Sequence, residues 1–274
     1  MSSDPNRLSR SLPSPAGLAA LLIAAALATW IVTVDRMRGM DAGPGTDLGA
    51  LGWYLGIWVT MMAAMMLPSV APMALLFAKV ARGRAERGRV YVSPWIFIGG
   101  YLAAWTAFGL VAYGAFRLVK AADLGFLAWS EHGPIVAGAA VAVAGLYQLT
   151  PLKQVCLKHC RGPMHFLLHG WREGRRGALV MGTEHGAYCV GCCWGLMIVL
   201  FALGVMSLFW MALVAAIIFA EKVLPFGYRL TRPLAILLVA FGLWIAVAPG
   251  SVPGLTDPSL VAPTMQMDDV GTNH

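Results

Sequence analysis

The chain has 274 residues, of which 59% are apolar and 12% are charged, and its formal net charge is +7. A soluble domain carries about 25% charged residues, so this composition excludes a soluble enzyme, a disordered chain and a disulfide-stapled secreted module, and it indicates an integral membrane protein. The five cysteines are too few, and odd in number, for a disulfide framework. Positive loops facing the cytoplasm explain the net charge without a nucleic-acid partner.

Seven segments are apolar enough for helices that cross a lipid bilayer, which takes about 20 residues. They are residues 17–34, 53–78, 95–119, 134–149, 187–204, 208–224 and 233–248. Because a lipid-facing backbone must satisfy its own hydrogen bonds, we predict an all-α fold, a polytopic bundle of about seven transmembrane helices. The first segment follows Arg7 and Arg10 and has a cleaved secretory signal as its alternative, but its length of about 18 residues favours an uncleaved helix.

The basic residues orient this bundle. With seven spans, 16 of the 20 Lys and Arg residues fall on the side of the N-terminus, and cytoplasmic loops carry an excess of these residues. We therefore predict a multi-pass protein of a bacterial inner membrane with the N-terminus inside and the C-terminus outside. Residues 1–16 form a cytoplasmic segment in this prediction, residues 17–249 the transmembrane domain and residues 250–274 a disordered extracytoplasmic tail.

The longest loop, residues 150–183, is the place for cytoplasmic structure. We expect a short amphipathic helix at the membrane interface around residues 164–172. The side chains expected to face lipid are Phe166, Leu167 and Trp171. Aromatic residues near the span ends, Tyr101 among them, predict a belt at the membrane surface.

A methionine cluster lies in the second predicted span. It reads MMAAMMLP over residues 61–68, so that Met61 with Met65, and Met62 with Met66, are i,i+4 pairs on shared helix faces. Thioethers are soft ligands that suit Cu(I), whereas methionine is also a flexible filler of apolar cores. The cluster precedes a proline, which kinks helices, and both interpretations stay open.

Two cysteines, Cys156 and Cys160, lie just past the fourth span. If this segment is helical, their thiols stack one turn apart. Several histidines are close in sequence, and thiol with imidazole is a donor set that binds Cu(I) or Zn(II). The alternative is that both cysteines are small apolar residues at the membrane interface.

A stripe of soft donors opens the fifth span. His185, Cys189, Cys192 and Cys193 fall within about 100° of one another on a helix. Four glycines border the stripe in two pairs with four-residue spacing, and such small residues let helices approach closely. They are Gly182, Gly186, Gly191 and Gly195. A close approach could bring the stripe against the methionine helix or against Cys156.

The predicted topology orders these donors across the membrane. Both cysteine groups converge at the cytoplasmic mouth, whereas the methionines lie near mid-membrane. The cytoplasm keeps thiols reduced, as a site for Cu(I) or Zn(II) requires. The candidate metal ligands are therefore Cys156, Cys160, His185, Cys189, Cys192, Cys193, Met61, Met62, Met65 and Met66.

Ionisable groups inside the membrane are functional candidates. Glu184 is either a carboxylate that orients the imidazole of His185 or an exposed loop residue. Glu221 and Lys222 are interpreted as a structural anchor that pairs internally or with Arg229.

Three strings together, MMAAMMLP at 61–68, PLKQVCLKHCR at 151–161 and GCCWGLM at 191–197, resemble a bacterial family that carries a domain of unknown function. Its members are described as predicted metal-binding integral membrane proteins. The resemblance covers about residues 50–230. It implies a polytopic inner-membrane protein with a metal site and supplies no reaction.

We carry three hypotheses forward. The first is a Cu(I)-handling protein that transports copper or delivers it to a partner, with zinc as the alternative metal. The second is a membrane thiol–disulfide enzyme built on the Cys189-x-x-Cys192 spacing. The third is a non-catalytic subunit of a larger membrane complex. The sequence has no Walker motif, no dinucleotide-binding glycine fingerprint and no nucleophile elbow, which excludes an ATP-driven pump within this chain.

Overall fold

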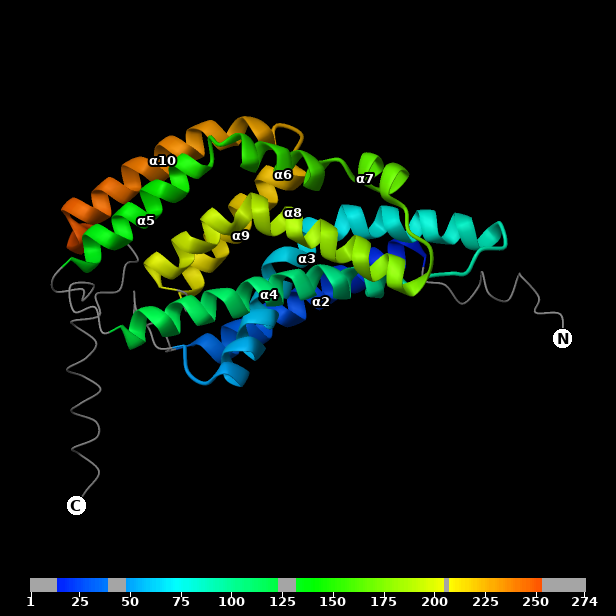
Figure 1. Cartoon of the computed structure of the whole chain (residues 1–274), viewed down its shortest axis with the longest axis horizontal. Helices are drawn as coiled ribbons and strands as arrows, with labels where there is room; N and C mark the ends of the chain where they lie inside the picture. Colours follow the sequence, from blue (N-terminus) through cyan, green and yellow to red (C-terminus); the bar gives the residue numbers. More distant parts are fainter. Residues whose placement is uncertain (1–13, 39–47, 123–131, 205–206, 253–274) are drawn as a thin grey trace, which may run out of the picture.

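The computed structural model describes residues 14–38, 48–122, 132–204 and 207–252. Within these ranges the chain forms nine α-helices, one short 3-10 helix and no strand, as Figure 1 shows. The helices are α2 (Pro15–Met37), α3 (Leu51–Glu86), α4 (Pro94–Ala121), α5 (Gly133–Tyr147), α6 (Pro151–Arg161), α7 (Pro163–Gly170), α8 (Gly174–Leu203), α9 (Leu208–Val223), α10 (Gly227–Val247) and the 3-10 helix η2 (Pro249–Ser251). The predicted all-α bundle is confirmed, whereas most of the predicted terminal segments lies outside the described residues.

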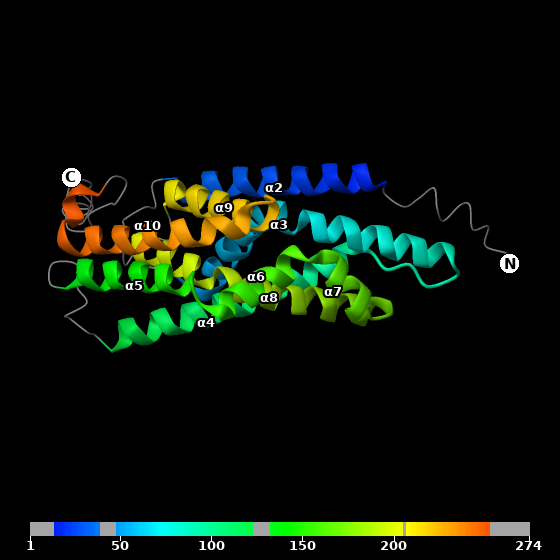
Figure 2. The same ribbon diagram turned by 90° about the horizontal axis from the view of Figure 1, so that it is seen from above.

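The long helices run in alternating directions along the long axis of the molecule (Figures 1 and 2). Helix α2 begins at one end of this axis, and α10 ends at the other. The most extensive helix contacts join α5 with α10, α4 with α8, and α2 with α3. Buried apolar side chains from all nine helices form one contiguous core.

Fewer helices than predicted have the length of a membrane span. Among the described residues, α2, α3, α4, α8 and α10 are long and apolar enough to cross a membrane, and the total is six if α5 and α6 form one span bent by 64°. Helix α9 has 16 residues and therefore spans about 24 Å, less than the hydrocarbon core. The chain is a multi-pass membrane protein, and its described residues contain five or six such candidate spans where the sequence predicts about seven.

Prolines and a capping threonine begin several helices. Proline occupies one of the first two positions of α2, α4, α5, α6 and α7, where its missing N–H costs no helical hydrogen bond. The Thr150 side chain accepts a hydrogen bond from the backbone N–H of Lys153 and thereby caps α6. Inside α3, by contrast, the helix continues through Pro68 and Pro72.

The expected cytoplasmic loop is almost entirely helical. It contains α6, α7 and the first turns of α8, which begins at Gly174 rather than near residue 187. The prediction that Phe166, Leu167 and Trp171 face lipid is wrong. Leu167 is buried in the core, Phe166 packs edge-on against His185, and Trp171 stacks on Phe77 of α3 with ring centroids 5.2 Å apart. The apolar side of α7 therefore covers the helix bundle.

An ion pair between Arg84 at the end of α3 and Glu173 just before α8 joins these helices on the surface. The guanidinium holds the pKa of the Glu173 carboxyl below its ordinary value. The Arg84 guanidinium also lies 5.2 Å from the centroid of the Trp171 ring, a cation–π distance. This contact keeps the start of α8 beside the basic end of α3.

Glycines set the distance between α4 and α8. A Cβ atom at Gly182 of α8 would collide with the backbone carbonyl of Phe97, and one at Gly100 of α4 would collide with the carbonyl of Leu179. Gly186 meets the backbone of α4 one turn further along. The predicted close approach is therefore confirmed, but its partner for this glycine pair is α4 and not the methionine helix.

We expect Gly100→Ala to destabilise the protein by about 1–3 kcal/mol, because the added methyl group meets backbone that cannot yield without moving a helix. Gly99→Ala is the matched control, since a Cβ atom there has no neighbour within 4 Å and alanine favours a helix over glycine. Thermal unfolding in detergent measures both. Equal melting temperatures for the two variants would contradict the close contact between α4 and α8.

Candidate functional site

The soft donors predicted on the fifth span occupy one buried face of α8. His185, Cys189, Cys192 and Cys193 are each at most 3% exposed. Met197 continues the same face and is also buried. These side chains therefore point into the protein rather than to lipid, as their spacing predicts.

Helix α6 lies against this face because α8 has a glycine at the contact. A Cβ atom at Gly191 would lie 2.7 Å from Cys156 Sγ, so the glycine leaves room for this thiol. One turn along, the His159 ring stacks on Tyr188 with centroids 4.3 Å apart. The Tyr147 hydroxyl at the end of α5 donates to the carbonyl of Gly191. The predicted approach of the stripe to Cys156 is confirmed.

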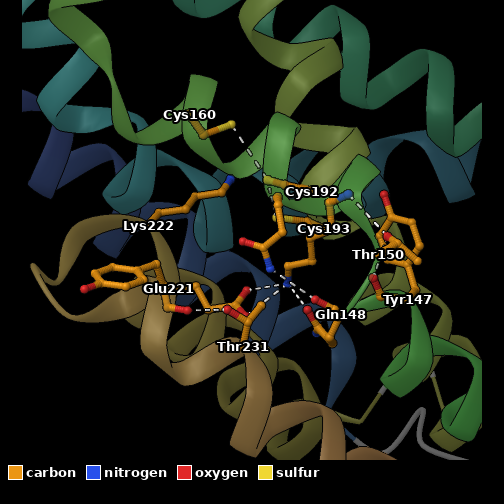
Figure 3. Close-up of polar contacts among 12 residues, drawn as sticks. Tyr147, Gln148, Thr150, Cys160, Cys192, Cys193, Glu221, Lys222 and Thr231 are labelled. Atoms are coloured by element: carbon orange, nitrogen blue, oxygen red, sulfur yellow. Dashed lines mark hydrogen bonds and ion pairs between the residues drawn. The ribbon is translucent and has the colours of Figure 1, made fainter.

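Four thiols meet where α6 contacts α8, and we call Cys160, Cys189, Cys192 and Cys193 the sulfur cluster. Cys160 Sγ lies 3.7 Å from Cys192 Sγ, and Cys192 Sγ lies 3.4 Å from Cys193 Sγ (Figure 3). The Cys192 thiol also donates to the backbone carbonyl of Cys189 at 3.2 Å, one turn earlier on the same face. All four are free cysteines. Cys156 is free as well but lies against Gly191, beside the cluster.

Two polar groups that we did not predict contact the cluster. Lys222 Nζ of α9 lies 2.7 Å from Cys189 Sγ, and the Tyr101 hydroxyl of α4 lies 2.9 Å from the same sulfur. Tyr101 is fully buried, so its assignment to an aromatic belt is wrong. The sequence does not reveal either contact, because each joins residues from helices distant in the chain.

A buried ion pair lies beside the sulfur cluster. Lys153 of α6 and Glu221 of α9 are at most 2% exposed, and Lys153 Nζ lies 2.7 and 3.0 Å from the two carboxylate oxygens. Gln148 accepts a further hydrogen bond from Lys153 (Figure 3). Arg161 donates to the backbone carbonyl of Glu221 and to two carbonyls further along. Glu221 thus pairs with Lys153, and the expected pairing with its neighbour or with Arg229 is wrong.

Aromatic rings surround the imidazole of His185, and one of its ring nitrogens has no hydrogen-bond partner. Its ring lies 5.5–5.9 Å from the rings of Phe97, Tyr101 and Phe166. Its Nδ1 atom is buried without a hydrogen-bond partner. Glu184 instead binds Arg172 at 2.5 Å and is partly exposed, so it does not orient the imidazole of His185.

The four methionines of α3 are all buried in the core that also contains the cysteines of α8. Met61, Met62, Met65 and Met66 are at most 2% exposed. Among the described residues, the hydrogen-bond contacts of the sulfur cluster involve no methionine side chain. The structure therefore places both sets of soft donors in one core without joining them into one site.

The sulfur cluster can bind soft cations through pairs of thiols. In the described part of the chain, no group of three or more His, Cys, Asp or Glu side chains is arranged so that it could hold a metal ion. Structural zinc requires four ligands in a tetrahedron. Thiolates select Cu(I) as well as zinc, and Cu(I) accepts two sulfur ligands. The geometry is thus better suited to a cation of low coordination number.

Residues 55–245, more than half of the chain, match the family model PpoB2, which is described as a copper chaperone. The matched region contains the methionine cluster, the sulfur cluster and the buried ion pair. No curated protein and no solved structure shows a match.

Removing one member of the buried Lys153–Glu221 pair leaves an uncompensated charge in the core. We expect Glu221→Gln or Lys153→Met to destabilise the protein by about 3–5 kcal/mol. The double variant K153M/E221L is expected to recover most of that loss, because it removes both charges and leaves apolar side chains. Chemical denaturation in detergent measures the difference, and additive losses in the double variant would contradict the pairing.

Proposed function

Because the chain belongs to the PpoB2 copper chaperone family, we propose that this multi-pass membrane protein binds Cu(I) at its sulfur cluster and delivers it to a partner protein. The observation that carries the proposal is the contact between helices at the thiols, where Cys160 Sγ of α6 lies 3.7 Å from Cys192 Sγ of α8, which in turn lies 3.4 Å from Cys193 Sγ. Copper is the cargo in this proposal and not a resident cofactor.

The chemistry of the cluster supports Cu(I) as the cargo. Thiolates are soft ligands, and reduced thiols persist on the cytoplasmic side of a membrane. The contacts of Cys189 with Lys222 and Tyr101 supply two hydrogen-bond donors to a thiolate at this position. A site of two sulfurs also suits a chaperone, because cargo must leave as readily as it enters.

The placement of the cluster supports delivery on the cytoplasmic side of an inner membrane. Helix α6, which carries Cys160, ends at Arg161 and is followed by α7, and α8 begins with the basic residues Arg175 and Arg176. Positive residues collect on the cytoplasmic side of membrane proteins. A partner that receives copper would approach on this side of the membrane.

The methionines provide a second step in this proposal. The core of the same bundle holds the thioether sulfurs of Met61, Met62, Met65 and Met66. Because a thioether carries no charge, it binds Cu(I) more weakly than a thiolate does. We propose that they pass Cu(I) to or from the sulfur cluster. His185 lies on the same buried face of α8 and would guide the ion as an auxiliary donor, whereas Cys156 lies against Gly191 and takes no part in this proposal.

The direct test is copper content. Protein purified in detergent under reducing, anaerobic conditions is expected to bind about one Cu(I) per chain, and Cys192→Ser should lose most of it, because Cys192 contacts two other cluster thiols. Cys156→Ser is the matched control from the same helix contact and should retain copper. Zinc in place of copper, or equal copper in both variants, would contradict the proposed site.

The methionine step predicts a separate outcome. Replacing the four methionines by leucine keeps apolar volume and should leave copper bound at the sulfur cluster while it slows transfer of Cu(I) to an acceptor. Copper stoichiometry and the rate of transfer to an external Cu(I) chelator, both measured in the same preparation, distinguish the two effects. An unchanged transfer rate would remove the methionines from the pathway.

A further inference from the structure

We propose that Lys222 makes the sulfur cluster selective for a monovalent soft cation, by supplying the single positive charge that a Cu(I)–dithiolate complex needs inside the membrane. This inference rests on the proposed function, since it concerns the same sulfurs. It assigns to Lys222 a role in specificity, through charge rather than through contact with the metal.

The geometry points Lys222 at the cluster. Its side chain extends from α9 toward the cysteines (Figure 3), and its Nζ atom lies 2.7 Å from Cys189 Sγ. Tyr101 approaches the same sulfur at 2.9 Å from α4. An ammonium at this distance forms a charge-assisted hydrogen bond with a thiolate. Lys222 is therefore positioned to balance charge on the sulfurs.

The charges around the cluster leave Lys222 without an acidic partner. The adjacent carboxylate, Glu221, is bound to Lys153 through both oxygens. Arg161 is directed at backbone carbonyls at the end of α9, which carry the partial negative charge of a helix C-terminus. Among the described residues beside the sulfur cluster, Arg161 and Lys222 thus have no carboxylate partner in the contacts described, and of these two cations it is Lys222 that contacts a cluster thiol.

This surplus charge favours one kind of complex. Cu(I) bound by two thiolates carries a net charge of −1, which Lys222 cancels. Zn(II) bound by four thiolates, its usual structural coordination, carries −2 and would leave a net negative charge. A net charge in an apolar interior is costly unless it is paired. The cluster with Lys222 is therefore matched to the monovalent complex.

The test compares variants that change the charge with one that does not. Affinities for Cu(I) and for Zn(II) are measured by competition with chelators for each ion, in detergent-purified full-length protein. Lys222→Met should weaken Cu(I) binding by about tenfold or more, the value of one charge-assisted hydrogen bond, and should lower the ratio of Cu(I) to Zn(II) affinity. Lys222→Arg keeps the charge and should keep the ratio.

The matched control is the double variant K153M/E221L, which removes one positive and one negative charge and leaves the net charge unchanged. Its affinity ratio should equal that of the unmodified protein. Should Lys222→Met fail to fold, as judged by thermal unfolding, Lys222→Gln provides a neutral polar side chain for the same comparison.

The outcomes separate this inference from the proposed function. If the unmodified protein binds no Cu(I), the proposed function fails, and the inference fails with it. If the unmodified protein binds Cu(I) and the neutral variants keep the same affinity ratio, the role of Lys222 is overturned while the copper site stands. A lower melting temperature without a change in ratio would show that Lys222 is only structural.

Discussion

Backbone contact between α8 and its neighbours is the constraint on which the rest of the structure depends. Gly182 and Gly186 bring α8 onto the backbone of α4, and Gly191 lets Cys156 of α6 pack against it. Without a hydrophobic driving force between helices in lipid, such small residues provide the close van der Waals contact that holds a bundle together. The same contacts bring the hydroxyl of Tyr101 and the thiol of Cys160 to the cysteine face of α8. The glycine contacts that pack the helices therefore also assemble the sulfur cluster.

The second constraint is charge in a core that otherwise excludes it. Lys153 and Glu221 neutralise each other between α6 and α9, and Lys222 turns to Cys189 instead. A buried pair of this kind adds little stability over apolar residues, but it fixes geometry, because either partner alone is costly. Here it holds the end of α9 at the start of α6, the two segments from which Lys222 and Cys160 reach the sulfur cluster.

Local patterns predicted most of the helices and the side chains of α8, because both depend on residues close in sequence. The helical spacing placed His185 and the three cysteines on one buried face, and the glycine pairs indicated close packing. Contacts between side chains on different helices could not be predicted in this way. The spacing around Lys222 does not show that it reaches Cys189 rather than Glu221, since that depends on how α9 is placed. The apolar residues of α7 suited lipid and protein equally, and only the bundle shows that they cover it.

The central claim is that Cu(I) is held by sulfur from α6 and α8. X-ray absorption spectroscopy of the copper-loaded protein, in detergent and under anaerobic conditions, tests this claim most directly because it reports the oxidation state and the ligand atoms of the metal together. Our account predicts Cu(I) with a coordination shell made only of sulfur and with two ligands. A shell dominated by nitrogen or oxygen, or copper in the divalent state under these reducing conditions, would contradict it.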